Sequence, residues 1–198
     1  MASRATDAWV DLRHGIDTVG LVPVDDLGLG GSRRVSAVHY YGTGWREMQA
    51  ILRRVDPRGG TYVDYGCGKG RSVLAAAGAR FDRVVGVELS AHLVEVARRN
   101  VARYRRPGLA PIEIVHADAA SHTLEDDESV FFFYNPFGAD VLALVLDRVE
   151  RSLQRRPRAV QLVYVNPVHA DTVDGRACLR RTGTLRLPRA DVALYASR

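Results

Sequence analysis

A glycine-rich segment in the first half of the chain is its strongest chemical signal. It reads Asp64-Tyr65-Gly66-Cys67-Gly68-Lys69-Gly70 and follows a short apolar run. Glycines at a strand-to-helix turn let the backbone pass close to a ligand, and the helix N-terminus presents N–H groups there. The segment therefore predicts a turn that wraps a small polar ligand.

Two carboxylates extend this prediction to a nucleoside. Glu88 lies 20 residues beyond Gly68, at the end of the next predicted strand. A carboxylate there can accept hydrogen bonds from both ribose hydroxyls of an adenosine-type ligand. Asp118 ends the third predicted strand and can accept from the adenine amino group. Because such ligands bind outside the carboxyl ends of the strands, these positions predict one nucleoside pocket.

Alternating strand and helix signals supply the framework for this pocket. Strands are predicted at 62–65, 83–88, 112–117, 129–134 and 159–165, and helices at 45–55, 71–79, 91–101 and 140–153. The strand at 129–134 is apolar on both faces, which is typical of an interior parallel strand. Residues 178–187 and 191–196 indicate a terminal hairpin. We expect an α/β fold, a doubly wound, Rossmann-like, mostly parallel seven-stranded sheet with a C-terminal antiparallel hairpin.

The first 58 residues read differently from the rest. Several glycines interrupt them, and they show little periodicity before the helix predicted at 45–55. We expect an N-terminal cap or lid over residues 1–58, irregular apart from that one helix. Residues 59–198 then form the ligand-binding domain.

Composition excludes several classes of protein. The chain has 198 residues, 46% of them hydrophobic, but no run approaches the ~20 apolar residues of a membrane span. Cys67 and Cys178 are too few for a disulfide scaffold or a cysteine-built zinc site. The first residues lack the apolar core of a secretory signal. We expect a cytoplasmic protein with no membrane partner, and leave its oligomeric state open.

The formal net charge of +5 favours no particular partner. Lys69 is the single lysine among 28 basic residues, and the arginines occur as short pairs scattered along the chain. A nucleic-acid-binding arm usually concentrates its charge and interleaves aromatic residues. A solvated surface is therefore favoured, and an anionic partner such as RNA or phosphate is the alternative.

Over about residues 60–196, the pattern resembles the class I S-adenosylmethionine-dependent methyltransferases. The GxGxG spacing of the glycine segment differs from the GxGxxG of dinucleotide binders. The resemblance implies an enzyme with S-adenosylmethionine as cofactor and S-adenosylhomocysteine as product. It implies that the cofactor is bound by Asp64, Gly66, Cys67, Gly68, Gly70, Glu88, Leu89, Asp118, Ala119 and Asn135. The alternatives are a non-binding glycine turn and a nicotinamide-dependent enzyme.

Tyr134-Asn135-Pro136-Phe137 ends the fourth predicted strand, where this family places residues beside the reactive methyl group. It resembles the (Asn/Asp)-Pro-Pro-(Tyr/Phe) motif of methyltransferases acting on planar nitrogens, but lacks the second proline. In that motif the asparagine side chain and the next carbonyl accept from the target amino group, and the aromatic ring stacks on its plane. The resemblance implies that Asn135 and Tyr134 are catalytic and that Pro136 and Phe137 bind the acceptor. A proline-stopped strand with Asn135 in a turn is the alternative.

A second Asn-Pro pair, Asn166-Pro167, follows the fifth predicted strand. Strands four and five are neighbours in the family's order, so Asn166 is expected to bind the acceptor across the same cavity. His169 would lie over its mouth as a third catalytic residue. An imidazole with a pKa of about 6.5 could take a proton from the acceptor; a surface histidine is the alternative.

Tyr40, Tyr41 and Thr43 precede the helix predicted at 45–55. In this family, sequence ahead of the first strand often covers the cofactor and shapes the acceptor pocket. Tyr41-Gly42-Thr43 is similar to a stretch of small protein-lysine methyltransferases and Dot1-like enzymes. The three residues are expected to bind the acceptor; packing against the helix edge is the alternative.

No His, Cys, Asp or Glu cluster has metal-ligand spacing, so no metal is expected. The exception to weigh is a Mg²⁺ site like that of catechol-type O-methyltransferases, to which Asp118 or Asn135 could contribute.

The resemblance implies methyl transfer to a nitrogen or oxygen of an acceptor. A small-molecule or peptide acceptor is favoured, because the short chain adds no substrate domain. A protein acceptor (lysine or glutamine) or RNA is the alternative within enzymes. A non-catalytic nucleoside- or RNA-binding protein is the alternative of another class.

Overall fold

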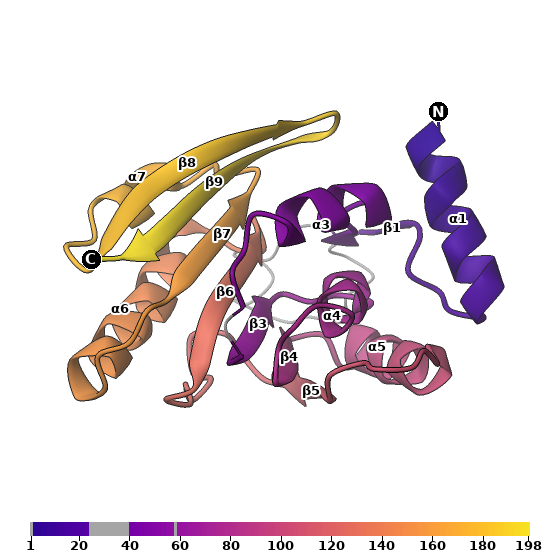
Figure 1. Cartoon of the computed structure of the whole chain (residues 1–198), viewed down its shortest axis with the longest axis horizontal. Coiled ribbons are helices and arrows are strands. Elements are labelled where there is room, and N and C mark those ends of the chain that lie inside the picture. The colour runs from indigo at the N-terminus through magenta and orange to yellow at the C-terminus, as the bar shows by residue number, and fades with distance from the viewer. Residues whose placement is uncertain (1, 24–39, 58) are drawn as a thin grey trace.

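A seven-stranded mixed sheet runs through the computed structural model, which describes residues 2–23, 40–57 and 59–198 (Figure 1). Its strand order is β5-β4-β3-β6-β7-β9-β8. The parallel strands are β3 (Thr61–Tyr65), β4 (Arg83–Glu88), β5 (Ile112–His116), β6 (Glu128–Tyr134) and β7 (Gln161–Val165). The antiparallel hairpin is β8 (Leu179–Leu187) and β9 (Ala190–Ser197). The predicted fold class is confirmed.

The strand order reverses between β3 and β6. From β3 the chain moves outward to β4 and β5, then crosses back to place β6 on the other side of β3. The register pairs Tyr65 with both Val87 and Phe133, so the three strands end at nearly the same level. Open α/β sheets bind ligands at such a reversal, outside the carboxyl ends of the strands.

Helices cover both faces of the sheet. On one face α3 (Trp45–Leu52), α4 (Arg71–Ala77) and α5 (Ala91–Arg103) pack against a core that includes Tyr62 and Phe132. On the other face α6 (Ala139–Arg155) and α7 (Ala170–Asp174) pack against a core that includes Phe131 and Phe133. Successive strand residues point to opposite faces, which is why this run of phenylalanines serves both cores.

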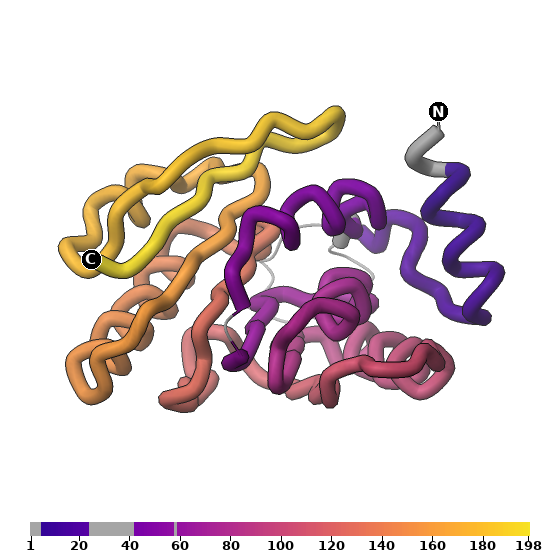
Figure 2. The backbone as a smooth tube through the Cα atoms, viewed as in Figure 1, coloured from indigo at the N-terminus to yellow at the C-terminus, as the bar shows by residue number. Residues whose placement is uncertain are grey.

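The N-terminal segment corrects one expectation. The sequence predicts a single helix in residues 1–58, but α1 (Ala2–His14) precedes α3 and packs beside it (Figure 2). The helix lacks a clear apolar stripe because it buries Asp7 and Asp11 while exposing Trp9 and Leu12. After α1, β1 (Leu21–Val22) pairs antiparallel with β2 (Tyr40–Tyr41). The division of the chain at residue 58 stays a prediction.

None of the helices in the described ranges combines the length and the apolar character needed to cross a membrane.

Candidate functional site

The glycine segment forms a tight loop between β3 and α4. Its backbone turns at Gly66, where φ is 81° and the main-chain N–H donates to the Val87 carbonyl at 2.8 Å. A Cβ built on Gly66 would lie only 2.5 Å from Pro136 Cβ. Gly68 and Gly70 have φ values of 56° and 87°. Positive φ and close approach together explain why the loop requires glycine.

Asp64 lies beneath this loop with one oxygen unpaired. It is 2% exposed, and its Oδ2 accepts a hydrogen bond from the Ser72 hydroxyl of α4. Among the described atoms, Oδ1 has no hydrogen-bond partner. Burial raises the pKa of Asp64 to about 7, and the nearby Glu88 charge adds to the shift while Ser72 opposes it. Buried acceptors without partners are rare, so Oδ1 is suited to a donor on a ligand.

Glu88 joins the loop to the end of β4. Its Oε2 accepts from the Gly68 N–H at 2.9 Å and its Oε1 from the Ser90 N–H at 2.8 Å. Burial raises the pKa of Glu88, against the opposing effect of these backbone hydrogen bonds. A carboxylate has about four lone-pair sites, so both oxygens can still accept from ligand hydroxyls. Leu89 follows, half-buried, and its carbonyl lies 3.1 Å from His116 Nε2.

The remaining residues predicted to bind the cofactor lie around these two carboxylates. Asp118 and Ala119 are half-buried just beyond β5, where Asp118 Oδ1 accepts from the Ala120 N–H at 2.9 Å. Cys67 is buried under the loop, and burial raises the pKa of its thiol. Its sulfur fills the space beside Gly86, where a Cβ would lie 2.7 Å away.

Two strained asparagines mark the neighbouring edge of the sheet. Asn135 (φ 41°) follows β6 and Asn166 (φ 48°) follows β7, and they are the non-glycine residues with positive φ in the described part of the chain. Each precedes a proline, a position that favours extended backbone. Such conformations cost on the order of 1–3 kcal/mol and concentrate at functional sites. Because β6 and β7 are paired, the two corners lie side by side.

A buried tyrosine organises the first of these corners. The Tyr164 hydroxyl donates to Asn135 Oδ1 at 3.0 Å and accepts from the His169 main-chain N–H at 3.4 Å. Burial raises the pKa of Tyr164, so the hydroxyl stays protonated and can donate. The Asn135 oxygen therefore faces Tyr164, and its NH₂ group faces away. The structure thus brings Asn135 and the start of α7 together through a residue that the sequence analysis missed.

Other residues predicted to act on the acceptor are placed differently. Phe137 is 8% exposed and its ring meets Phe133 edge-on, with centroids 6.1 Å apart. Most of that ring packs in the core, so little of it is available to stack on an acceptor. Tyr134 is half-buried on the opposite face of the sheet, and Pro136 lies against the glycine loop.

The residues ahead of α3 approach the loop from the N-terminal side. Thr43 is buried, and its carbonyl accepts from Arg71 Nη1 at 3.2 Å. The main chains of Tyr40 and Tyr41 form β2, and their side chains lie outside the described part of the structure. Their expected contacts with the acceptor stay predictions.

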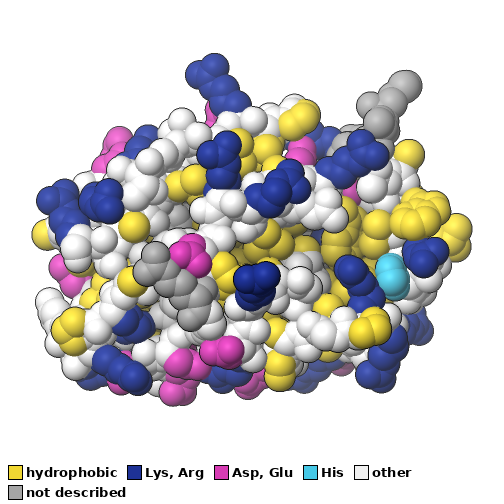
Figure 3. Space-filling model, in the orientation of Figure 1, with side chains coloured by type: hydrophobic (Ala, Val, Ile, Leu, Met, Phe, Trp, Pro, Cys, Tyr) yellow, Lys and Arg dark blue, Asp and Glu magenta, His cyan; other side chains and the backbone are white. Residues whose placement is uncertain are grey.

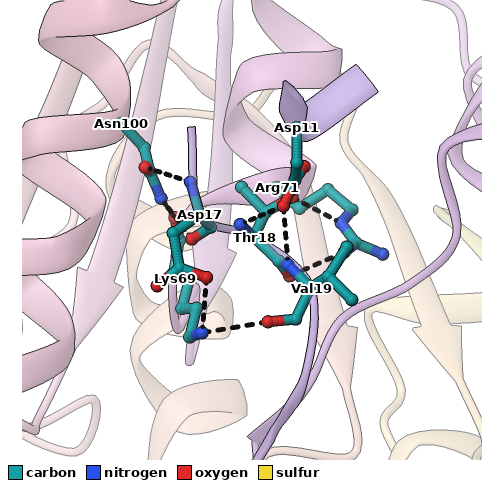
Figure 4. Close-up of polar contacts among 7 residues, drawn as sticks. All are labelled: Asp11, Asp17, Thr18, Val19, Lys69, Arg71 and Asn100. Atoms are coloured by element: carbon teal, nitrogen blue, oxygen red, sulfur yellow. Dashed lines mark hydrogen bonds and ion pairs between the residues drawn. The ribbon is translucent and has the colours of Figure 1, made fainter. Parts of the chain in front are cut away.

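A polar network between the loop and the N-terminal segment was not predicted (Figure 4). Lys69, Arg71 and Asn100 contact the backbone and side chains of residues 17–19. These partners are separated by some 50 to 83 positions in the sequence. Their spacing therefore carries no local signal of the contact.

Within residues 2–23, 40–57 and 59–198, no three His, Cys, Asp or Glu side chains are grouped so as to hold a metal ion.

Comparisons with known proteins place this geometry in context. The family model for a methyltransferase domain matches residues 63–156, which run from the middle of β3 to just past the end of α6. The adenine nucleotide translocase lysine N-methyltransferase of Mus musculus is 32% identical over 133 residues, which cover 66% of this chain and 56% of that protein. The ribosomal protein L11 methyltransferase of Tolumonas auensis is 34% identical over 67 residues, 32% of this chain and 23% of that protein. The chain thus spans about a quarter to just over half of the length of these curated relatives.

A solved structure shows the same fold. The RNA methyltransferase from Salinibacter ruber in complex with S-adenosyl-L-homocysteine superposes with a TM-score of 0.57 at 20% identity. The match covers 79% of this chain and 94% of that one. At this identity the likeness concerns the fold alone.

Proposed function

Because this chain belongs to the class I S-adenosylmethionine-dependent methyltransferases, we propose that it transfers the cofactor's methyl group to a nitrogen or oxygen of an acceptor. S-adenosylmethionine supplies that methyl group on a positively charged sulfonium. The observation that carries the proposal is the unpaired Oδ1 of Asp64, buried under the glycine loop among the described atoms.

The carboxyl ends of β3, β4 and β5 supply the groups that hold the cofactor. Asp64 accepts from the cofactor's amino group, a cation that favours the ionised carboxylate. Glu88 accepts from the ribose hydroxyls, and its bonds to Gly68 and Ser90 fix its carboxylate for that task. Asp118 accepts from the adenine amino group, beside Leu89 and Ala119.

The Asn135 and Asn166 corners hold the acceptor. Methyl transfer depends mainly on alignment, because acceptor, methyl carbon and sulfur must be held nearly in line. Asn135 orients the acceptor, and Tyr164 orients Asn135. A neutral amine needs little help to lose its proton afterwards. A hydroxyl acceptor needs a base, a role that falls to His169.

A small molecule or peptide is the acceptor that we propose first. A lysine of a protein is the second candidate, because a relative named as a lysine N-methyltransferase matches 66% of the chain. The distribution of positive charge gives less support to RNA as the acceptor. On the face shown in Figure 3, Lys and Arg side chains are dispersed rather than gathered into one patch, and a nucleic-acid footprint normally clusters them.

Calorimetric titration with S-adenosylhomocysteine tests the cofactor, with NAD⁺ as the control ligand. We expect S-adenosylhomocysteine to bind with micromolar affinity and NAD⁺ not to bind. Asp64→Ala should abolish or strongly weaken the binding of S-adenosylhomocysteine. Asp56→Ala should not, because this exposed carboxylate lies at the opposite end of the parallel strands, where the Asp56 N–H donates to Gln161 at the start of β7. Binding of NAD⁺ alone would overturn the assignment.

Transfer of a labelled methyl group tests the acceptor. The protein is incubated with methyl-labelled S-adenosylmethionine and either the small-molecule filtrate or the macromolecular fraction of a cell extract. Label in the filtrate supports the first candidate. Label in the macromolecular fraction that is released by protease supports a protein acceptor, and label released by ribonuclease supports RNA.

A further inference from the structure

Residues 15–20, here called the strap, follow α1 and lie against the glycine loop (Figure 4). Asp11, in the last turn of α1, bonds to the strap. Its carboxylate accepts from the Thr18 N–H at 2.5 Å, the Thr18 hydroxyl at 2.6 Å and the Val19 N–H at 2.8 Å. These hydrogen bonds join the strap to α1 and do not involve the loop.

Two cations from the loop and the start of α4 bind the strap. Lys69 Nζ donates to Asp17 Oδ1 at 2.8 Å and to the Val19 carbonyl at 3.0 Å. Arg71 donates to the Thr18 hydroxyl at 2.9 Å and to the Thr18 carbonyl at 2.6 Å. Arg71 is 4% exposed and Thr18 is fully buried, so the hydrogen bonds between them are shielded from water and correspondingly strong. The Asp17 side chain is 64% exposed, so its ion pair with Lys69 contributes less.

Asn100 of α5 bonds to the strap and the loop at once. Its Oδ1 accepts from the Asp17 N–H at 2.8 Å, and its Nδ2 donates to the Asp17 carbonyl at 2.7 Å. The same Nδ2 donates to the Lys69 carbonyl at 2.9 Å. Asn100 is 1% exposed, and these three hydrogen bonds of its amide join the strap to the glycine loop.

We propose that Asn100 and Lys69 are positioning residues that couple docking of the strap to binding of the cofactor. The inference rests on the proposed function, because it assigns S-adenosylmethionine to the other side of the same loop. Gly68 donates to Glu88, and the next residue, Lys69, is bonded through both its carbonyl and its ammonium group. Asn100 holds the Lys69 carbonyl and the strap holds the Lys69 ammonium group. Together they fix the peptide unit that follows Gly68, whose N–H donates to the ribose-binding carboxylate.

Coupling of this kind is reciprocal. If the docked strap favours the loop conformation that binds the cofactor, then the cofactor favours the docked strap by the same factor. A purely structural role for Asn100 would change stability but would not make the strap respond to the cofactor. This response is the readout that separates the two roles.

The first experiment measures S-adenosylhomocysteine affinity by calorimetry in matched variants of the full chain. Asn100→Asp keeps the shape and the acceptor oxygen but loses both N–H donors, and we expect affinity to fall about tenfold or more. Asp17→Ala removes the Lys69 ion pair and should lower affinity a few-fold. Arg99→Ala is the control, because Arg99 lies exposed on the same helix, where it pairs with Glu95, and its loss should leave affinity unchanged.

The second experiment measures amide hydrogen exchange of the strap with and without S-adenosylhomocysteine. We expect saturating ligand to slow exchange at Asp17, whose N–H donates to Asn100, in the wild type, and much less in Asn100→Asp. Should Asn100→Asp fail to fold, Asp17→Ala decides, because its side chain is 64% exposed and its removal leaves the core intact. Wild-type affinity in the variants, or strap exchange indifferent to bound ligand, overturns the coupling alone. A wild type that binds no S-adenosylhomocysteine overturns the proposed function, and the coupling with it.

Discussion

The two halves of the candidate site are built by different means. At the carboxyl ends of β3 and β4, the buried Asp64 and Glu88 are held by a serine hydroxyl and by main-chain N–H groups of the loop and helix starts. At the ends of β6 and β7, the half-buried Asn135 and Asn166 adopt strained backbone conformations. The first half offers fixed carboxylates, and the second offers an adjustable pair of amides.

This difference indicates a division of labour. A cofactor shared by a whole family needs the same carboxylates in the same places, and backbone hydrogen bonds supply them with little dependence on neighbouring side chains. An acceptor that differs between relatives needs a surface whose shape depends on side chains. The strained corners provide that surface, since their conformation depends on what surrounds them. Four predictions test this division, from the largest expected effect to the smallest.

Glu88→Ala should weaken S-adenosylhomocysteine binding by roughly 5- to 150-fold, the equivalent of about 1–3 kcal/mol from lost hydrogen bonds to a charged group. Calorimetric titration measures the change, and urea unfolding checks that the variant still folds. Asn135→Ala is the matched change in the other half and should leave this affinity nearly intact while lowering turnover. Equal losses in the two variants would contradict a division between the halves.

Lowering the pH should weaken cofactor binding through Asp64. Burial raises its pKa to about 7, and the cationic amino group of the ligand binds the ionised carboxylate. Below pH 7 the carboxyl group must therefore lose a proton on binding, so affinity falls by up to about tenfold per pH unit. Titrations from about pH 5 to 8 measure this slope, and Asp64→Asn should flatten it. A wild-type profile as flat as that of the variant would remove Asp64 from contact with the amino group.

Tyr164→Phe should lower turnover by roughly two- to tenfold, as expected for one hydrogen bond of about 0.5–1.5 kcal/mol. The Asn135 amide loses the donor that fixes its orientation, while the groups that hold the cofactor are untouched. Initial rates with the labelled acceptor fraction measure turnover, and calorimetry measures the affinity for S-adenosylhomocysteine, which should not change. Weaker cofactor binding in this variant would show that Tyr164 supports both halves.

Asn166→Gly should raise the free energy of unfolding by less than about 1 kcal/mol, because glycine adopts positive φ without strain but loses more entropy on folding. Asn135→Gly should raise the free energy of unfolding by less than Asn166→Gly does, since it also loses the hydrogen bond from Tyr164. Urea denaturation of both variants gives the comparison. Destabilisation by Asn166→Gly would mean that its side chain holds the corner.

Local sequence signals predicted the first half of the site and much of the fold. The glycine spacing, the apolar strand before it and the position of Glu88 all lie within one strand–helix–strand unit, from β3 to β4, where periodicity and turn chemistry are informative. Tyr164, Asn100 and Asp11 were not predicted, because each acts on a segment that only the folded chain brings near. The helix α1 was missed for a related reason, since it turns carboxylates inward where an apolar stripe is the usual signal.

Gly66 belongs to the first half of the candidate site and Pro136 to the second, and the two residues lie in close contact. A Cβ at position 66 would fall 2.5 Å from the Cβ of the proline, and the φ of 81° at this position also requires glycine. Position 66 is therefore expected to remain glycine among relatives of this chain, and residue 136 to remain packed against it. Evolution toward a new acceptor would accordingly proceed around this pair, and an engineer altering specificity should leave it in place.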